Sequence, residues 1–147
     1  MPLIRQAMPE EAYVVAEFMT RFESETSHVK VDARHAGTIY ESIISRGVGC
    51  MFMLFNDGGD MIGGLGCIKA PDLHYPRIIA VETYWYVMPE HRGVGIQLME
   101  HFEQWAKDNG CDAVAFVHLS DSMPEILQKV YEKRGYKLIE QHFLKEI

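Results

Sequence analysis

Apolar residues recur at helical spacing in four segments of the chain. The first stripe follows Pro9, a residue that suits a first helical turn, and consists of Ala12, Val15, Ala16, Met19 and Phe22. Asp32 is a candidate N-cap for a second helix, which Gly47 would end. The inner face of that helix is predicted to be Ala36, Ile39, Tyr40, Ile43 and Ile44. Two later helices are predicted over Arg92–Asn109 and Met123–Arg134, and a glycine follows each of them.

Extended segments rich in β-branched and aromatic residues separate these helices. The predicted strands are Leu3–Ala7, Val48–Asn56, Met61–Lys69, Ile78–Val87, Cys111–His118 and Tyr136–Glu146. The order β-α-α-β-β-β-α-β-α-β predicts one α/β domain over residues 1–147 with a mixed central sheet. Because the last two helices each join two strands, we expect those strands to be parallel, with right-handed crossovers.

Composition and charge exclude several classes of protein. The 147 residues are 48% hydrophobic and 24% charged, as in an ordinary globular domain. The net charge is −7 and no basic run occurs, so no nucleic-acid surface is expected. The longest apolar stretch, Val48–Phe55, is too short to span a membrane, and the first residues lead us to expect no signal peptide.

The cysteines and histidines carry no disulfide or metal signature. Cys50, Cys67 and Cys111 are odd in number and lack CxxC spacing, which favours buried thiols in a reducing cytoplasm. The seven histidines lack metal-ligand spacing, and His91 is expected to face solvent. No metal site is therefore expected.

A glycine-containing junction follows the predicted strand Ile78–Val87. Amide groups at a helix N-terminus attract anions, and Gly93 and Gly95 would let an anion approach the backbone. The junction lacks both the Walker lysine and the third glycine of a dinucleotide fingerprint. It predicts a phosphate or pyrophosphate cradle, with a plain glycine turn as the alternative.

Two motifs resemble those of the GNAT N-acetyltransferase superfamily. Arg92-Gly93-Val94-Gly95-Ile96, preceded by Val87-x-Pro89-Glu90, resembles the acyl-CoA signature Arg/Gln-x-x-Gly-x-Gly/Ala. Tyr131-Glu132-Lys133-Arg134-Gly135-Tyr136 resembles the Tyr-Glu-Lys-x-Gly-Phe segment of the family. Gln97 departs from the first motif. Pro124 stands where many members carry asparagine. Any cofactor contact of that asparagine would here come from Ser120, Ser122 or a water.

The resemblance implies an N-acetyltransferase that moves an acetyl group from acetyl-CoA to a primary amine of a small molecule or protein. In the family, the two strands flanking the signature helix splay apart and the pantetheine arm enters between them. Strand residues would pair with pantetheine, and loop amides would hold the pyrophosphate. The resemblance therefore implies these cofactor-binding residues: Trp85, Tyr86, Val87, Arg92, Gly93, Val94, Gly95, Ile96 and Gln97. An N–H group near Tyr86 would polarise the thioester carbonyl. Lys129, Lys133 and Arg134 would add positive charge near the ADP end.

Direct attack needs a base, because an amine of pKa about 10 is only about 0.1% neutral at pH 7. The resemblance points to Glu82, ten residues before Arg92, where many relatives carry glutamate. The alternative is a strand glutamate paired with a cation. Tyr131 would protonate the departing thiolate; its alternative role is packing against Leu127. His118 is a weaker candidate base.

Two loops are expected to form the acceptor pocket, Glu23–Asp32 and Asp72–Arg77. Glu23, Glu25 and Asp32 would either attract a cationic amine or form a solvated face, and the solvated face is favoured. Neither loop carries a recognisable substrate motif.

Two other functions fit the same scaffold. A non-catalytic acyl-CoA-binding or regulatory module is compatible with the departure at Gln97. A toxin-like enzyme acting on aminoacyl-tRNA would need a basic face, which the net charge of −7 disfavours. The expected partners are acetyl-CoA and an amine acceptor in the cytoplasm, and a homodimer is one expectation because dimers are common among relatives.

Overall fold

The computed structural model describes residues 2–26, 29–119 and 122–147. The chain divides into two units, Met1–Val117 and His118–Ile147, which are described separately. Within the described residues, no helix combines the length and the apolar character needed to cross a membrane. The prediction of one domain over residues 1–147 stays a prediction.

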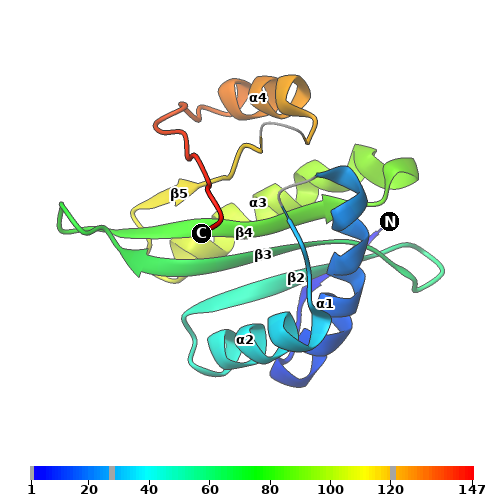
Figure 1. The fold of residues 1–147 in the computed structure, drawn as a ribbon. Helices are drawn as coiled ribbons and strands as arrows, with labels where there is room; N and C mark the ends of the chain where they lie inside the picture. The colour runs from blue at the N-terminus through cyan, green and yellow to red at the C-terminus, as the bar shows by residue number, and fades with distance from the viewer. Residues whose placement is uncertain (1, 27–28, 120–121) are drawn as a thin grey trace. The chain divides into compact units, whose positions relative to one another are not determined.

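The first unit contains a five-stranded sheet in the spatial order β1-β2-β3-β4-β5 (Figure 1). The strands are β1 (Leu3–Gln6), β2 (Gly49–Phe55), β3 (Met61–Pro71), β4 (Ile78–Val87) and β5 (Ala113–Ala115). Neighbouring strands are antiparallel except β4 and β5, which are parallel. The sheet is therefore mixed, as predicted, and the strands before and after the signature helix are parallel as expected.

The helices of the first unit cover both faces of the sheet. They are η1 (Pro9–Glu11), α1 (Ala12–Met19), η2 (Thr20–Glu25), α2 (Ala33–Ser45), η3 (Pro89–Val94) and α3 (Gly95–Asp108). Residues of α1 and α2 pack on one face of the sheet, and those of α3 pack on the other (Figure 1). β2 is buried on both faces, because its alternate residues enter the two cores. This explains why its sequence is a continuous apolar run rather than an alternating one.

Local signals in the sequence predict most element ends correctly. The Asp32 side chain accepts a hydrogen bond from the His35 amide (2.9 Å) and caps α2. Gly47, Gly110 and Gly135 follow helices with positive φ, the conformation that favours glycine. The prediction for Ile39 is wrong. It was expected on the inner face of α2, but the residue is 47% exposed.

Two strand predictions near the C-terminus are wrong: one strand is shorter than predicted, and the other does not form. The strand expected at Cys111–His118 is β5, which is only three residues long. In the second unit, α4 (Pro124–Lys133) forms as predicted, but the strand expected at Tyr136–Glu146 does not. Leu138, Ile139 and Phe143 in that segment are exposed, so its apolar side chains have no buried face to occupy. The order of elements is otherwise as predicted.

Two glycines of β3 make room for hydroxyl groups of neighbouring side chains. A Cβ on Gly64 would overlap the Tyr84 hydroxyl, and one on Gly66 would lie 2.9 Å from the Thr83 hydroxyl and 3.1 Å from the Tyr40 hydroxyl. Among the described residues, the buried Tyr84 hydroxyl has no hydrogen-bond partner. Burial accordingly raises its pKa well above the usual value.

We predict that Gly64→Ala lowers the free energy of unfolding by about 1–3 kcal/mol, because the new methyl group overlaps the Tyr84 hydroxyl. Tyr84→Phe is expected to be neutral or stabilising, because it removes an unpartnered buried hydroxyl. In the Tyr84→Phe background, the loss caused by Gly64→Ala should shrink by about 1 kcal/mol or more. Denaturant unfolding of the four proteins measures this coupling.

Gly93→Ala is the matched control, because a Cβ there would meet no atom within 4 Å. Its free energy of unfolding should stay within about 0.5 kcal/mol of the parent. Strictly additive effects of Gly64→Ala and Tyr84→Phe would contradict the proposed overlap.

Candidate active site

The two strands that border the candidate site separate after a short paired region. β3 pairs with β4 from Ile78 to Val87, whereas β5 pairs only with Ile79, Ala80 and Val81. In the described part of the chain, the edge of β4 from Glu82 to Val87 faces no partner strand on the β5 side. The divergence that the family resemblance implied is therefore present within the first unit.

Backbone groups of β4 alternate between the β3 edge and the open edge. The Met88 amide donates to the Ile62 carbonyl of β3 (2.9 Å), whereas the Val87 carbonyl accepts from Arg92 Nε (3.1 Å). Because successive residues point to opposite edges, the backbone groups of Trp85 and Val87 face the open edge and those of Tyr86 face β3. Of the three residues expected to pair with pantetheine, two lie on the open edge, and one carbonyl there already has a partner.

A β-bulge determines which face of the sheet Glu82 occupies. The register between β3 and β4 shifts so that Cys67 lies opposite Glu82 and Thr83 is an extra residue. In an uninterrupted strand, Glu82 would share the face of Tyr84, which packs with α1 and α2. The bulge instead leaves Glu82 on the α3 face, together with Cys67 and Trp85.

The Glu82 carboxyl is buried and has little polar support. Its residue is 6% exposed, and the Val117 amide donates to Oε2 at 3.3 Å. Burial raises the pKa of Glu82 to about 8, and the Val117 hydrogen bond offsets only part of that rise. No lysine, arginine or histidine among the described residues forms an ion pair with it, so the alternative of a cation-paired strand glutamate does not describe this carboxyl.

The junction after β4 is a short 3-10 helix rather than an open glycine turn. In η3 the His91 amide donates to the Met88 carbonyl (2.8 Å), and the Gly95 amide donates to the Arg92 carbonyl. One of the amides expected to hold pyrophosphate is thus already engaged within the helix.

Neither glycine of this junction is needed for backbone conformation or packing. Gly93 and Gly95 have no positive φ. A Cβ on Gly93 would meet no atom within 4 Å, and one on Gly95 would make only an ordinary contact with Val87 (3.5 Å). Gly93 is exposed, and the space left by its missing side chain fits the close approach of an anionic group such as pyrophosphate.

The Arg92 side chain connects the junction to a distant segment of the first unit. Its guanidinium pairs with Glu25 of η2 (2.8 Å) and lies 6.0 Å from the centre of the Tyr86 ring. Glu25 lies 67 residues earlier in the sequence, and no sequence motif indicates this partnership.

Each of the three acidic residues of the first expected acceptor loop has a structural partner. Besides the pair of Glu25 with Arg92, Glu23 accepts a hydrogen bond from the Val31 amide, and Asp32 caps α2. The predicted solvated face is therefore an incomplete description of these carboxylates.

The structure does not bring the two expected acceptor loops together. The loop Asp72–Arg77 joins β3 to β4 at the start of β4, where Asp72 pairs with Arg77 (2.8 Å). Glu25 instead lies near the end of β4, where Arg92 binds the Val87 carbonyl. The two loops thus lie at opposite ends of one strand (Figure 1).

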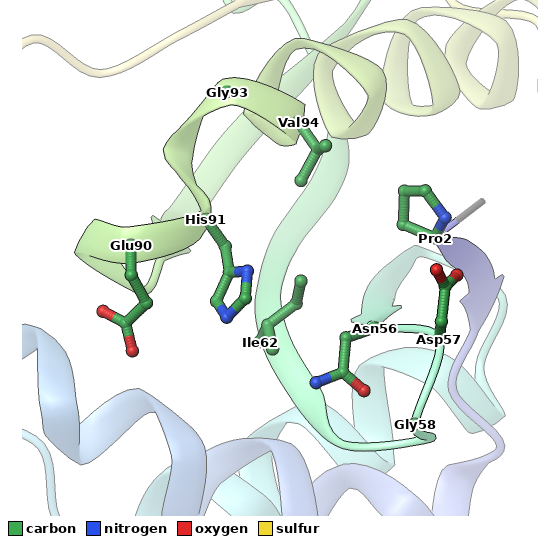
Figure 2. A pocket seen from close by; sticks show the side chains of 9 residues that line it. All are labelled: Pro2, Asn56, Asp57, Gly58, Ile62, Glu90, His91, Gly93 and Val94. Carbon is green, nitrogen blue, oxygen red and sulfur yellow. The ribbon is translucent and has the colours of Figure 1, made fainter.

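A surface pocket of about 520 Å³ adjoins the junction but not the candidate base. Figure 2 shows it between the β2–β3 turn and η3, lined by Pro2, Asn56, Asp57, Gly58, Ile62, Glu90, His91, Gly93 and Val94. Glu82, Trp85 and Tyr86 do not line it. His91, which was expected to face solvent, is half-buried and lines this pocket.

The second unit holds the candidate acid. Tyr131 of α4 is buried, and its ring centre lies 6.3 Å from that of His118 and 6.0 Å from that of Tyr136. His118 Nε2 lies 2.7 Å from the Pro124 carbonyl oxygen, which can only accept, so Nε2 carries the proton. That nitrogen of the weaker candidate base therefore does not serve as a proton acceptor in this arrangement.

Other predicted cofactor contacts also belong to this unit. Lys129, Lys133 and Arg134 are exposed residues on and directly after α4, and Ser122 is buried. Ser120 lies outside the described residues.

Comparison with family models identifies the family of the chain. A model of the acetyltransferase (GNAT) family matches residues 12–136. None of the curated proteins compared with the chain matches it.

Three solved structures illustrate the similarity of fold. An aminoglycoside acetyltransferase from an uncultured soil metagenomic sample has 14% identity and a TM-score of 0.78, with 100% of this chain and 99% of that chain covered. AAC(6')-Iy in complex with the bisubstrate analog CoA-S-monomethyl-acetylneamine has 21% identity and a TM-score of 0.74, with coverage of 100% and 98%. Ribosomal-protein-alanine N-acetyltransferase from Brucella melitensis biovar Abortus 2308 has 13% identity and a TM-score of 0.73, with coverage of 100% and 99%.

At these identities the solved structures show the fold alone, whereas the family model spans most of the chain. The protein therefore belongs to the acetyltransferase (GNAT) family, whose enzymes use acetyl-CoA.

Proposed function

We propose that this protein is an N-acetyltransferase that moves the acetyl group of acetyl-CoA to a primary amine of a small molecule or a protein. The observation that carries the proposal is the buried Glu82 carboxyl, located where β5 diverges from β4. A carboxyl with a pKa of about 8 can accept a proton from an ammonium group near neutral pH far better than an ordinary glutamate can.

The donor is proposed to bind along the open edge of β4 and at the start of α3. The backbone of Trp85 and Val87 would pair with the amides of pantetheine, as an added strand would. The amides from Gly93 to Gln97 that η3 leaves accessible would hold the pyrophosphate. The open space beside Gly93 supports this placement.

The proposed reaction is direct transfer. Glu82 takes a proton from the ammonium group of the acceptor, directly or through a water molecule. The amine nitrogen then attacks the thioester carbonyl, so that a C–N bond forms. As the C–S bond breaks, the nitrogen releases its second proton to solvent, and Glu82 later returns its own proton to solvent. Tyr131 gives its proton to the departing thiolate and regains one from solvent. The products are the acetylated amine and free CoA.

The acceptor is proposed only at the level of a primary amine. The solved structures of similar fold are named for acceptors as different as an aminoglycoside and a ribosomal-protein alanine. In the first expected acceptor loop, Glu23, Glu25 and Asp32 each have partners within the first unit, so their charge does not single out one amine.

We propose a reducing cytoplasm as the location of the reaction. Cys50, Cys67 and Cys111 are free thiols, and the first two are buried. Free thiols at buried positions are compatible with a compartment that keeps cysteine reduced.

We predict that the protein releases free CoA from acetyl-CoA when the right amine is supplied. A thiol-release assay over polyamines, aminoglycosides, amino acids and peptide N-termini measures this, and calorimetry with acetyl-CoA measures binding. Binding without thiol release for any amine would favour the non-catalytic acyl-CoA module. Absence of acetyl-CoA binding would contradict both functions.

For Glu82→Gln we predict a loss of kcat/KM that is largest below pH 8 and shrinks above it. The wild-type base acts when ionised, so log kcat/KM should rise with pH up to about 8 and then level off. The variant depends on free amine alone, so its kcat/KM should keep rising toward the pKa of the acceptor, about 10. Profiles from pH 6 to 10 give the comparison.

Glu10→Gln is the matched control, because it makes the same charge change on an exposed residue of η1. It should leave the pH profile unchanged. A Glu82→Gln profile that still levels off near pH 8 would assign the base to another group.

For Tyr131→Phe we expect kcat to fall at least tenfold, while the Kd for acetyl-CoA changes less than about twofold. The substitution removes the proposed proton donor but keeps the ring that packs against His118 and Tyr136. Tyr136→Phe, which removes a neighbouring hydroxyl, should retain activity. Equal turnover for Tyr131→Phe and wild type would remove the acid assignment.

A further inference from the structure

The Arg92 side chain joins three segments that are remote in sequence. Nε donates to the Val87 carbonyl at the end of β4, and a terminal nitrogen pairs with Glu25 of η2. Arg92 itself belongs to η3, which leads directly into α3. The side chain thus connects the open edge of β4, the segment before α2, and the start of the candidate anion site.

This connection lies in a partly buried setting. The side chains of Arg92 and Glu25 are 30% and 22% exposed, so solvent screens their attraction less than that of a surface pair. The Tyr86 ring lies beside the guanidinium, and Phe18 and Phe22 pack against that ring with centroid distances of 5.8 Å each. The aromatic contacts limit where the guanidinium can move.

We propose that Glu25 is a positioning residue for the acetyl-CoA site and acts through Arg92. By pairing with the guanidinium, Glu25 keeps Arg92 on the Val87 carbonyl and so holds η3 in the conformation that presents the start of α3. Glu25 itself does not touch the donor. The inference rests on the proposed function for the identity of the ligand, and it assigns to η2 an influence on donor binding.

The charge of Glu25 makes this role distinguishable from a simple electrostatic one. An isolated carboxylate near a pyrophosphate site repels the anionic ligand, so removing it would tighten binding. A positioning carboxylate has the opposite effect, because its removal releases Arg92 and loosens η3. The sign of the change in Kd therefore separates the two roles.

The test measures the Kd for acetyl-CoA by calorimetry in full-length wild type, Glu25→Gln, Arg92→Gln and the double variant. Each single change should raise the Kd by about three- to tenfold, the range of a partly exposed ion pair. The double variant should bind no more weakly than the weaker single variant, because the two residues act as one unit. Glu25→Asp should recover part of the affinity, and Glu10→Gln should match wild type.

Two further readouts separate positioning from general damage to the fold. In Glu25→Gln the KM for acetyl-CoA should rise, while kcat at saturating donor stays within about twofold of wild type. In the free proteins, hydrogen exchange of amides in η3 should speed up in Glu25→Gln, while amides in β2 keep their wild-type rates. The exchange measurement needs no ligand, so it tests the link even if the donor is not acetyl-CoA.

Several outcomes would overturn the proposal. Unchanged or tighter binding in Glu25→Gln, additive effects in the double variant, or unchanged exchange in η3 would each show that Glu25 does not act through Arg92. If the wild type binds acetyl-CoA and turns over, and the Glu25 variants are indistinguishable from it, the acetyltransferase function stays intact and only the positioning role is removed. Failure of wild type to bind acetyl-CoA, with faster η3 exchange in Glu25→Gln, would overturn the proposed function and keep the link between the two segments.

Discussion

β4 is held by partner strands on both edges only between Ile79 and Val81, and beyond that point β3 alone holds it as far as Val87. A strand with one open edge presents backbone donors and acceptors that require partners. Arg92 satisfies one of them at the Val87 carbonyl. In an acetyltransferase, the amides of an extended donor arm are suited to satisfy others. The interruption of strand pairing is thus the constraint from which the proposed binding edge follows.

The same interruption lets a carboxyl occupy the interior, where no cation of the described residues forms an ion pair with it. Glu82 lies one residue beyond the last paired position, and its hydrogen bond comes from Val117, two residues beyond the end of β5. A charged carboxylate at such a position is costly, so the fold shifts the equilibrium toward the neutral acid. With a pKa of about 8, roughly one tenth of the carboxyl is ionised at pH 7. Burial of the Glu82 carboxyl makes it a poor contributor to stability, but the same burial makes it suitable as a base.

Glycine serves two different purposes in this chain. In β3, a Cβ on Gly64 would overlap the Tyr84 hydroxyl, and one on Gly66 would crowd the hydroxyl groups of Thr83 and Tyr40. At the junction after β4, Gly93 and Gly95 have no positive φ, and among the described residues a Cβ on Gly93 would meet no atom within 4 Å. At both places the glycines indicate that some group approaches the backbone closely, but the sequence does not identify that group. Neighbouring side chains account for the first pair, and an anionic ligand is a physical account of the second.

The sequence by itself determined the order of elements up to α4, the limits of β4, the caps at Asp32 and Gly110, and the family through its two motifs. These features depend on residues that are close together in the chain, where periodicity and turn chemistry act directly. Tertiary structure alone decided the face that Glu82 occupies, the pairing of Glu25 with Arg92, and the missing strand after Gly135. The first two depend on a bulge and on a partner contributed by distant residues, and the third depends on whether a buried face is present for the segment. A local pattern carries no information about any of these.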